Sequence, residues 1–346
     1  MTELPKMLVV LGAPDAIAAT TAEARRRNLQ LPGNSGLVSA LIGTLRERAI
    51  AHEVIVAWPD GATGGEELRE TTGVEVLVNG ICEPLTQRGA LQQVARLAQE
   101  MDLPALNSPR VIEATARPAM AQRVGQGDGV RAPHCTLYKA ASGMGTLVEH
   151  VQAEGHRYPV LLRPVGSHGS TGLVRAGDDA DVAAAARAIG TCTVTDFVDF
   201  RSEDGLWRKY RMVYAGGELL RRHLLIDQQW NVVGDSRYFM FERGLFDEER
   251  EWLDRPVEET EPIEARVLEQ FEATELDFGA IDYAVLPDGE LVIFELNACV
   301  QVTGTIPEEH RPLIGYLEAN NDEIIDAVLE RVRSVVAGAP GAGASA

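Results

Sequence analysis

Hydrophobic positions in the N-terminal part of the chain follow two alternating spacings. Residues 37–48 and 91–101 repeat apolar side chains every three to four positions, which predicts amphipathic helices. Short apolar runs rich in β-branched residues predict buried strands at residues 7–11, 53–58 and 74–78. Strands that alternate with helices are typical of a parallel sheet covered by helices. The pattern therefore predicts an N-terminal Rossmann-like unit that ends near residue 108.

Strand-like runs dominate the second half of the chain. They predict strands at residues 193–197, 210–214, 218–226, 281–286 and 291–296. Between them, residues 242–275 are acidic and carry a mostly helical pattern. Residues 337–346 consist largely of Gly, Ala and Ser, and we expect this low-complexity tail to be disordered.

Composition narrows the class of protein. The chain has 346 residues, of which 45% are hydrophobic and 24% charged, enough for two or three packed units. A formal net charge of −20 argues against a general binder of nucleic acid or membrane surfaces. No apolar run approaches the roughly 20 residues of a membrane span. Because no two cysteines have CxxC spacing, free thiols and a cytoplasmic location are expected.

A hairpin is the strongest chemical signal. The segment GAIDYAVLPDGELVIFELNACV, residues 279–300, places a Pro-Asp-Gly-Glu turn between two apolar strands. If residues 288–289 form a two-residue loop, Asp282 lies directly opposite Glu295. Since side chains alternate along a strand, Asn297 shares the face of Glu295. Three oxygen-bearing side chains are thus predicted on one patch of an apolar hairpin.

The two carboxylates suggest a metal site. Directly opposed positions have Cβ atoms about 5 Å apart, so two ionised carboxylates should repel each other and shift their pKa values. A divalent cation would remove this conflict, and hard oxygen ligands suit Mg²⁺. The alternative is an edge hairpin with solvated carboxylates. Whether Asn297 is a ligand or a capping amide stays open at this stage.

A glycine-rich loop is the second signal. In YPVLLRPVGSHGSTGLV, residues 158–174, an apolar strand runs into Arg163 and then into a loop with glycines at 166, 169 and 172. Glycines allow close approach of the backbone, and successive N–H groups can surround phosphate oxygens. A plain surface loop is the alternative. A third segment, TVTDFVDF at 193–200, is a strand with two acidic groups.

Taken in this order, the segments resemble the ATP-grasp superfamily of the carboxylate–amine ligase type. The matching segments are LNSP (106–109), VRAPHCT (130–136), PVLLRPVGSHGSTG (159–172), TDFVDF (195–200), YRMVYAGGELLRRH (210–223) and FGAIDYAVLPDGELVIFELNA (278–298). The resemblance implies a mixed α/β and α+β fold, with a Rossmann-like domain followed by a two-subdomain ATP-grasp fold. The expected parts are the Rossmann-like domain (1–108), the central subdomain with the lid loop (109–194), the C-terminal subdomain with the Mg²⁺ site (195–336) and the tail (337–346).

The resemblance also implies a site for ATP and Mg²⁺. The residues that would bind the nucleotide are Arg117, Arg163, Gly166, Ser167, His168, Gly169, Asp196, Phe197, Val198, Asp199 and Glu203. Asp282, Glu295 and Asn297 would ligate Mg²⁺, and Arg211 and Arg222 would neutralise the transferred phosphoryl group. At Arg117 and Arg163 the superfamily commonly has lysine. Arginine keeps the charge but presents a different geometry to phosphate.

The implied activity is an ADP-forming ligase that makes an amide or peptide bond through an acyl phosphate. Its partners would be a small-molecule carboxylate and an amine, with an amino acid or peptide favoured, and a homodimer is left open. One alternative is a catalytically silent nucleotide-binding regulatory protein of the same fold. Another is a dinucleotide-dependent oxidoreductase, but Gly12-Ala13-Pro14 after the first strand lacks the expected GxGxxG pattern.

Overall fold

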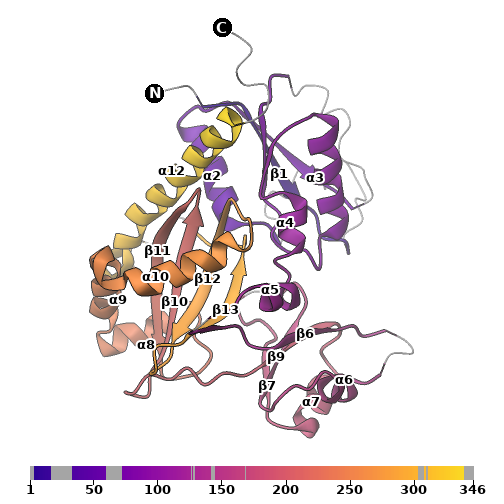
Figure 1. Ribbon diagram of the computed structural model, residues 1–346, viewed down its shortest axis with the longest axis vertical. Coiled ribbons are helices and arrows are strands. Elements are labelled where there is room, and N and C mark those ends of the chain that lie inside the picture. Colours follow the sequence, from indigo (N-terminus) through magenta and orange to yellow (C-terminus); the bar gives the residue numbers. More distant parts are fainter. Residues whose placement is uncertain are drawn as a thin grey trace.

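The computed structural model describes residues 4–16, 33–59, 72–125, 127, 129–141, 145–167, 169–302, 308 and 311–338, without the side chains of 257–261, 313 and 319. Over these residues the strands form three separate sheets, which Figure 1 shows. Two sequence-based predictions fall outside the described residues. One is the nucleotide contact of His168, and the other is the disordered tail over residues 339–346.

The N-terminal sheet is parallel throughout. Its strand order is β2-β1-β3-β4, with strands β1 (Met7–Gly12), β2 (His52–Ala57), β3 (Val76–Asn79) and β4 (Ala105–Leu106). The described helices of this unit are α2 (Gly36–Glu47) and α3 (Arg88–Glu100), and each buries an apolar stripe spaced three to four residues apart. The predicted alternation of strands and helices in this unit is confirmed.

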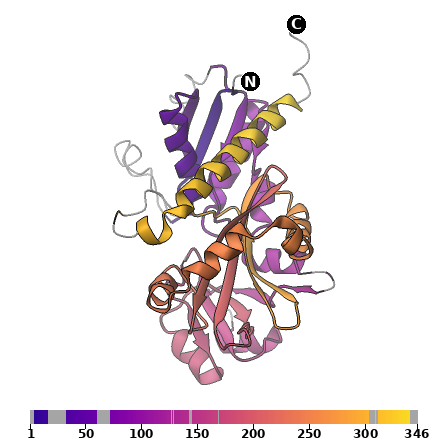
Figure 2. The same cartoon turned by 90° about the vertical axis from the view of Figure 1, so that its left-hand side faces the viewer.

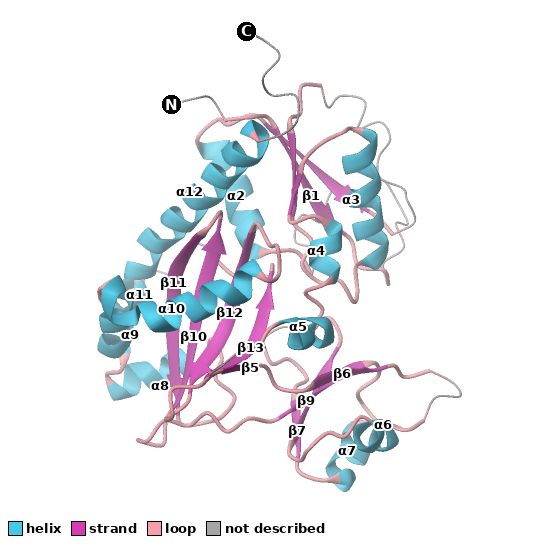
Figure 3. Cartoon of the chain, in the orientation of Figure 1, coloured by secondary structure: helices cyan, strands magenta, loops and turns pink. Residues whose placement is uncertain are grey.

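A small antiparallel sheet follows. It has the order β6-β9-β7-β8, formed by β6 (Cys135–Tyr138), β7 (Val160–Pro164), β8 (Val174–Ala176) and β9 (Cys192–Asp196). Short helices α4 (Pro109–Glu113) and α5 (Arg117–Arg123) lead into it, and α6 (Leu147–Ala153) and α7 (Asp179–Ala185) lie beside it in Figure 3. Helix α6 begins with a capping box between Thr146 and Glu149.

The third sheet is the largest. Its order is β11-β10-β12-β13-β5, formed by β10 (Trp207–Ala215), β11 (Glu218–Asp227), β12 (Phe278–Val285), β13 (Leu291–Asn297) and the short strand β5 (Val130–Arg131). Only β5 pairs in parallel, with β13. The helices of this part are α8 (Ser236–Arg243), α9 (Phe246–Asp254), α10 (Val257–Glu272), α11 (Arg311–Ile314) and α12 (Tyr316–Ala337). Strands β12 and β13 are therefore inner strands, and their apolar side chains are buried.

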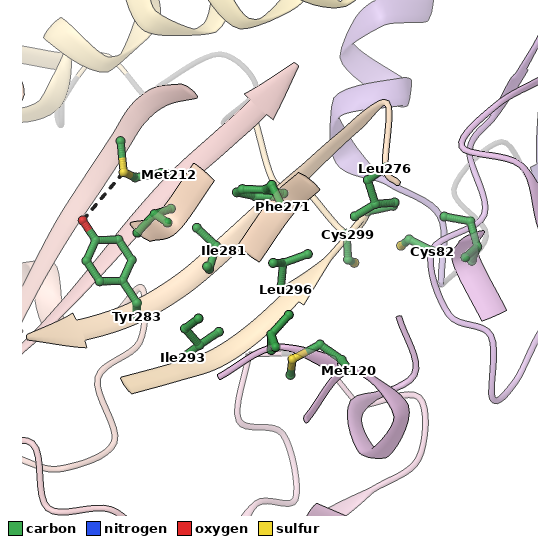
Figure 4. Close-up of a cluster of buried hydrophobic side chains, with 14 of the residues drawn as sticks. Cys82, Met120, Met212, Phe271, Leu276, Ile281, Tyr283, Ile293, Leu296 and Cys299 are labelled. Atoms are coloured by element: carbon green, nitrogen blue, oxygen red, sulfur yellow. Dashed lines mark hydrogen bonds between the residues drawn. The ribbon is translucent and has the colours of Figure 1, made fainter. Parts of the chain in front are cut away.

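The hairpin β12–β13 is anchored by its apolar face. Ile281, Tyr283, Ile293 and Leu296 are buried there and pack in one cluster with Phe271 of α10 (Figure 4). The hydroxyl of Tyr283 also contacts the sulfur of Met212 on β10 at 3.7 Å. This packing fixes the hairpin, so the polar side chains of its opposite face have defined positions.

Helix α12 joins the first and third sheets. It crosses from the large sheet to the N-terminal unit, as Figure 2 shows. Ile324 and Val328 of α12 share one apolar cluster with Leu41 of α2 and with Val213 of β10, and Arg48 pairs with Asp326 at 2.5 Å. The central sheet has a separate apolar cluster of its own. The N-terminal unit and the large sheet thus share a core, whereas the central sheet does not take part in it.

All four cysteines are buried free thiols, as expected from their spacing. Among the described residues, no helix combines the length and the apolar character needed to cross a bilayer.

Candidate nucleotide and substrate site

A cleft lies where the central sheet faces the large sheet. One cavity is lined mainly by apolar side chains from β6, β7, β9 and the segment around Trp230. A second cavity, of about 520 Å³, is lined by β10, β11 and the start of α12. Both cavities share a set of polar residues, namely Arg117, Arg163, Ser170, Lys209, Asp282 and Glu295. These residues therefore stand at the junction of the two cavities.

The turn of the β12–β13 hairpin differs from its predicted form. The backbone N–H of Leu286 donates to the carbonyl of Glu290, and that of Gly289 donates to the carbonyl of Leu286, both at 2.9 Å. The loop thus contains three residues, 287–289, and the predicted two-residue loop is wrong. Proline at the first loop position favours a type I turn, and Gly289 takes the left-handed φ of +86° that must follow it.

A β-bulge then restores the predicted register. Tyr283 pairs with Ile293, whereas Asp282 pairs with Glu295, so Phe294 is an extra residue in β13. Without this residue, the three-residue loop would have placed Asp282 and Glu295 out of register. The predicted opposition of these two carboxylates is therefore confirmed, although the local structure that produces it was not predicted. Because of the bulge, Phe294 and Glu295 both line the cleft.

A second bulge shapes the other wall. On β11, His223 pairs with Arg211 and Arg221 pairs with Met212, so Arg222 is the extra residue. Arg222 and His223 consequently both line the larger cavity, although neighbours in a regular strand point to opposite faces. Arg221 lies on the other side of the sheet, where it pairs with Glu264 at 2.7 Å.

Cations surround both carboxylates. Arg211 donates to Asp282 from Nε at 2.5 Å and from Nη2 at 2.9 Å, and Lys209 lies 3.4 Å from the same carboxylate. Glu295 pairs with Arg117 at 2.6 Å. Burial alone would raise the pKa of Asp282, but Arg211 and Lys209 hold it well below its usual range.

The pKa of Glu295 is also lowered. Burial and the charge of Asp282 raise it, but Arg117, Arg163 and Arg211 more than offset that effect. The expected repulsion between the two carboxylates thus exists but is outweighed. Because this set of cations comes from α5, β7 and β10, the hairpin sequence alone could not indicate it.

The donor set of the hairpin fits a magnesium ion. The amide of Asn297 donates to Glu295 at 2.5 Å, which places it beside that carboxylate, and its oxygen accepts the N–H of Cys299 at 2.8 Å. Two carboxylates and an amide oxygen on one face suit a hard cation that keeps several waters and shares phosphate oxygens. No group of three or more His, Cys, Asp or Glu side chains with metal-binding geometry occurs in the part of the chain that is described. The fit therefore depends on ligands from a bound phosphate or water.

Two arginines that were predicted to bind the nucleotide lie at the junction of the two cavities. Arg163 ends β7 and Arg117 begins α5, and both line the two cavities. Burial and the nearby charge of Arg117 lower the pKa of Arg163 to about 10. Arg163 makes no ion pair with the described carboxylates, which leaves its charge available for an anion.

The glycine-rich loop begins directly after β7. Gly166 has a left-handed φ of +76°, and a Cβ there would lie 2.9 Å from Thr86 of the N-terminal unit. Gly166 and Ser167 line a small cavity between this unit and Glu295, and Gly169 lines the 520 Å³ cavity. The described part of the loop thus borders the region in which Arg163 and Glu295 lie.

The apolar cavity suits a planar base. Phe197 packs edge-on against Trp230 with ring centroids 5.7 Å apart, and the Arg175 guanidinium lies 4.4 Å from the Phe197 ring. The N–H of Asp196 donates to His134 and that of Phe197 to Pro159, so these two donors are used within the protein. Among the described residues no partner is found for the N–H of Val198. Of these three residues, all predicted to bind the nucleotide, Val198 is therefore the one whose backbone N–H is available as a donor.

Asp199 and Glu203, which were also predicted to bind the nucleotide, lie further out. Asp199 forms a bidentate pair with Arg201 that is exposed to solvent. Neither Asp199 nor Glu203 is among the residues that line the described apolar cavity. The other predicted nucleotide and metal residues line the cavities described above, apart from His168.

Sequence reasoning missed several lining residues, among them Lys209, Arg237, Trp230 and His223. Lys209 is two positions before Arg211 on β10, so strand periodicity alone could have placed it on the same face. Arg237 reaches the cavity from α8, and its two Nη atoms bind the buried Glu249 at 2.9 and 3.0 Å. No local pattern predicts this contact or the positions of Trp230 and His223, since all three depend on tertiary packing.

Comparisons with known proteins identify the fold. The sequence matches no protein-family model and no curated protein. The structure is similar to that of D-alanine–D-alanine ligase from Bacillus anthracis complexed with ATP, with a TM-score of 0.56 at 10% identity over 97% of this chain and 99% of that one. A second structure of the B. anthracis ligase gives 0.55 at 8% identity over 97% and 99%, and the ligase from Coxiella burnetii gives 0.53 at 10% identity over 95% and 96%.

The chain therefore has an ATP-grasp fold, as the sequence predicted, with the architecture of the D-alanine–D-alanine ligases over nearly its whole length. At 8–10% identity this similarity establishes the fold and leaves the reaction to be argued from the site.

Proposed function

We propose that this protein is an ATP-dependent carboxylate–amine ligase that forms an amide or peptide bond through an acyl phosphate and releases ADP. The observation that carries the proposal is the meeting of two cavities at Asp282 and Glu295. One cavity is apolar and suits a base, whereas the other is lined by arginines and suits an anionic substrate. A phosphoryl donor and a carboxylate acceptor placed in these cavities would meet at the carboxylate pair.

Each wall of the cleft has a role in this proposal. Arg117 and Arg163 would bind the phosphates of ATP. Asp282, Glu295 and Asn297 would hold Mg²⁺, which when bound neutralises charge on the transferred phosphoryl group. Arg211 and Arg222 lie on the other side of Asp282 and would stabilise negative charge on the acceptor carboxylate and the acyl phosphate.

The substrate cavity limits the size and charge of the acceptor. Its volume of about 520 Å³ lies within the usual range for small-molecule sites, about 300–1,000 Å³. Arg211, Arg222, Arg237 and His223 line it, together with apolar side chains such as Leu317. An amino acid or short peptide with a free carboxylate matches these dimensions and charges.

A catalytically silent nucleotide-binding protein remains the second candidate. The presence of both carboxylates, Asn297 and the arginines of the substrate cavity weighs against it, because a purely regulatory site does not need a second, cationic cavity. A dinucleotide-dependent oxidoreductase is disfavoured by β1 itself. The N–H and C=O of Gly12 are both bonded to the side chain of Asn34, at 2.7 and 2.8 Å, so that this turn offers no free backbone donor at Gly12 to a pyrophosphate.

Calorimetry and ADP release test the proposed function. We expect ATP to bind with Mg²⁺ present and to bind much more weakly in EDTA, since the carboxylates alone repel the phosphates. A coupled assay for ADP with a panel of amino acids and short peptides should then show release that depends on the acceptor. Tight ATP binding without acceptor-dependent ADP release would favour the regulatory alternative. NADH binding in place of ATP would contradict both.

Substitution of Arg163 should separate binding from stability. We expect Arg163→Met to weaken Mg-ATP binding by about 10- to 100-fold, because a charge-assisted contact worth about 1.5–3 kcal/mol is lost. The melting temperature without nucleotide should not fall, because burial and the neighbouring charge of Arg117 already disfavour the positive charge of Arg163. Arg187→Met, an exposed change in the same subdomain, is the matched control and should alter neither quantity. Unchanged affinity in Arg163→Met would place Arg163 outside the nucleotide site.

A further inference from the structure

A chain of hydrogen bonds runs from the base cavity to the surface of the central subdomain. Nδ1 of His156 lies 2.6 Å from Oδ1 of Asp196, and Nε2 of His156 lies 2.7 Å from the hydroxyl of Thr136. The same hydroxyl lies 2.9 Å from Nε2 of His150. The His156 side chain is completely buried, and the ring of His134 packs against it at a tilt of 36°, with ring centroids 4.4 Å apart. Residues of β6, β9, α6 and the segment between α6 and β7 thus form one connected polar network.

The carboxylate sets the direction of every bond in this chain. Asp196 only accepts when ionised, so Nδ1 of His156 donates to it. In a neutral His156, Nε2 must then accept, and the Thr136 hydroxyl donates to it. The remaining lone pairs of that hydroxyl accept from Nε2 of His150. Burial lowers the pKa of His150, in keeping with a neutral imidazole.

The chain occupies one oxygen of Asp196 and leaves the other available. Oδ1 accepts from His156 and also, at 3.3 Å, from the N–H of Arg157. Asp196 lines the apolar cavity, and Oδ2 has no hydrogen-bond donor among the described residues. A carboxylate oxygen at the edge of a base cavity accepts a hydrogen bond from an exocyclic amino group and repels an oxo group.

We propose that His156 is a positioning residue for base selection: it fixes the Asp196 carboxylate so that Oδ2 faces the base, and the cavity thereby selects a 6-aminopurine over a 6-oxopurine. Thr136 and His150 act behind it by fixing the tautomer of His156. The inference rests on the proposed nucleotide site. It goes further because it assigns the choice of base to a side chain that does not line the described cavity.

Two isosteric substitutions separate this role from general packing. The amide nitrogen of asparagine replaces Nδ1 of histidine and reaches Asp196, whereas that of glutamine replaces Nε2 and reaches Thr136. Equilibrium binding of ATP and of ITP, which differ in the 6-substituent, would be measured with Mg²⁺ for the full-length chain. We expect wild type to bind ATP about 30- to 100-fold more tightly than ITP. This is the preference expected when ATP makes one hydrogen bond to a charged group, here Oδ2 of Asp196, and ITP does not.

The preference should persist in His156→Asn within about threefold and fall below about fivefold in His156→Gln. His52→Gln is the control, since its Nδ1 bonds only the carbonyl of Ile50 in the N-terminal sheet. The preference should be unchanged in this variant. A preference retained equally in His156→Asn and His156→Gln would overturn the inference.

A spectroscopic measurement on the unmodified protein keeps the test independent of variant folding. Long-range ¹H–¹⁵N spectra of the histidine rings should show His156 protonated on Nδ1 and His150 protonated on Nε2. The opposite tautomer at His156 would contradict the inference. Equal affinity of wild type for ATP and ITP would also contradict it while leaving the proposed function intact, whereas failure to bind either nucleotide would contradict both.

Discussion

Replacing Glu295 by glutamine should abolish most turnover and also destabilise the protein without ligands. The first effect follows because a carboxylate that would bind Mg²⁺ becomes neutral, and loss of several kcal/mol of transition-state stabilisation lowers the rate about 1,000-fold. The second follows because Arg117 loses its partner at 2.6 Å, and Asp282 alone then remains opposite the cations. We expect a loss of about 1–3 kcal/mol, measured by denaturant unfolding.

The opposite stability effect would follow if repulsion between the carboxylates dominated. If only the two carboxylates of the hairpin are considered, Glu295→Gln relieves their repulsion, and the melting temperature of the variant should be unchanged or higher. The lowered pKa of Glu295 shows that attraction to Arg117 and the other cations prevails. Glu290→Gln is the matched control, because Glu290 lies on the same hairpin and pairs with Arg131 at the surface. A rise in stability of Glu295→Gln would refute the electrostatic description of the site.

Replacing Asp282 by asparagine should cost still more stability. Asp282 is 5% exposed and neutralises Arg211 and Lys209, whose side chains are only 18% and 20% exposed. Breaking a buried ion pair from one side costs about 3–5 kcal/mol. The control is Asp326→Asn, which removes an Arg–Asp pair of the same 2.5 Å length between exposed side chains and should cost at most about 1 kcal/mol.

The loss in Asp282→Asn should depend on pH in a defined direction. The pKa of Asp282 is lower in the folded than in the unfolded protein, so its contribution is complete above the unfolded value of about 4. As the pH falls from there towards the folded pKa, wild type loses this contribution and the variant does not. The stabilities of wild type and variant should therefore differ by a constant amount from pH 7 down to about pH 5 and should converge as the pH falls towards 3. A difference that stays constant over the whole range would show that the pKa of Asp282 is the same in the folded and the unfolded protein.

Periodicity was sufficient to predict the main elements of the fold. The parallel N-terminal sheet, the helices α2 and α3 and the hairpin β12–β13 follow from apolar spacing, because burial of one face requires that spacing in any fold. The ordered set of short motifs also predicted the ATP-grasp architecture. The predicted positions of Arg163 and of the glycine loop depend only on where the single strand β7 ends, and the structure places that end at Pro164.

The register of the hairpin shows where local reasoning stops. The sequence predicted that Asp282 faces Glu295, but it did so with a two-residue loop and a regular strand. The structure has a three-residue loop and a bulge at Phe294, and the two deviations cancel. A bulge depends on how the strand packs against its neighbours, so one strand's sequence cannot place it. The same holds for Arg222, which lines the substrate cavity because of a bulge in β11.

The sequence by itself therefore determined that Asp282 and Glu295 face each other and which strands present them. Only the tertiary structure decided their charge environment. Arg117, Lys209 and Arg211 come from other elements. Their charges outweigh the repulsion between the two carboxylates, so that the pKa values of both are lowered and not raised. The network behind Asp196 likewise joins β6, α6 and the segment before β7. Electrostatic interactions depend on distance in space. The charge environment of a side chain is therefore decided by residues that are distant in sequence and come close to it only when the chain folds.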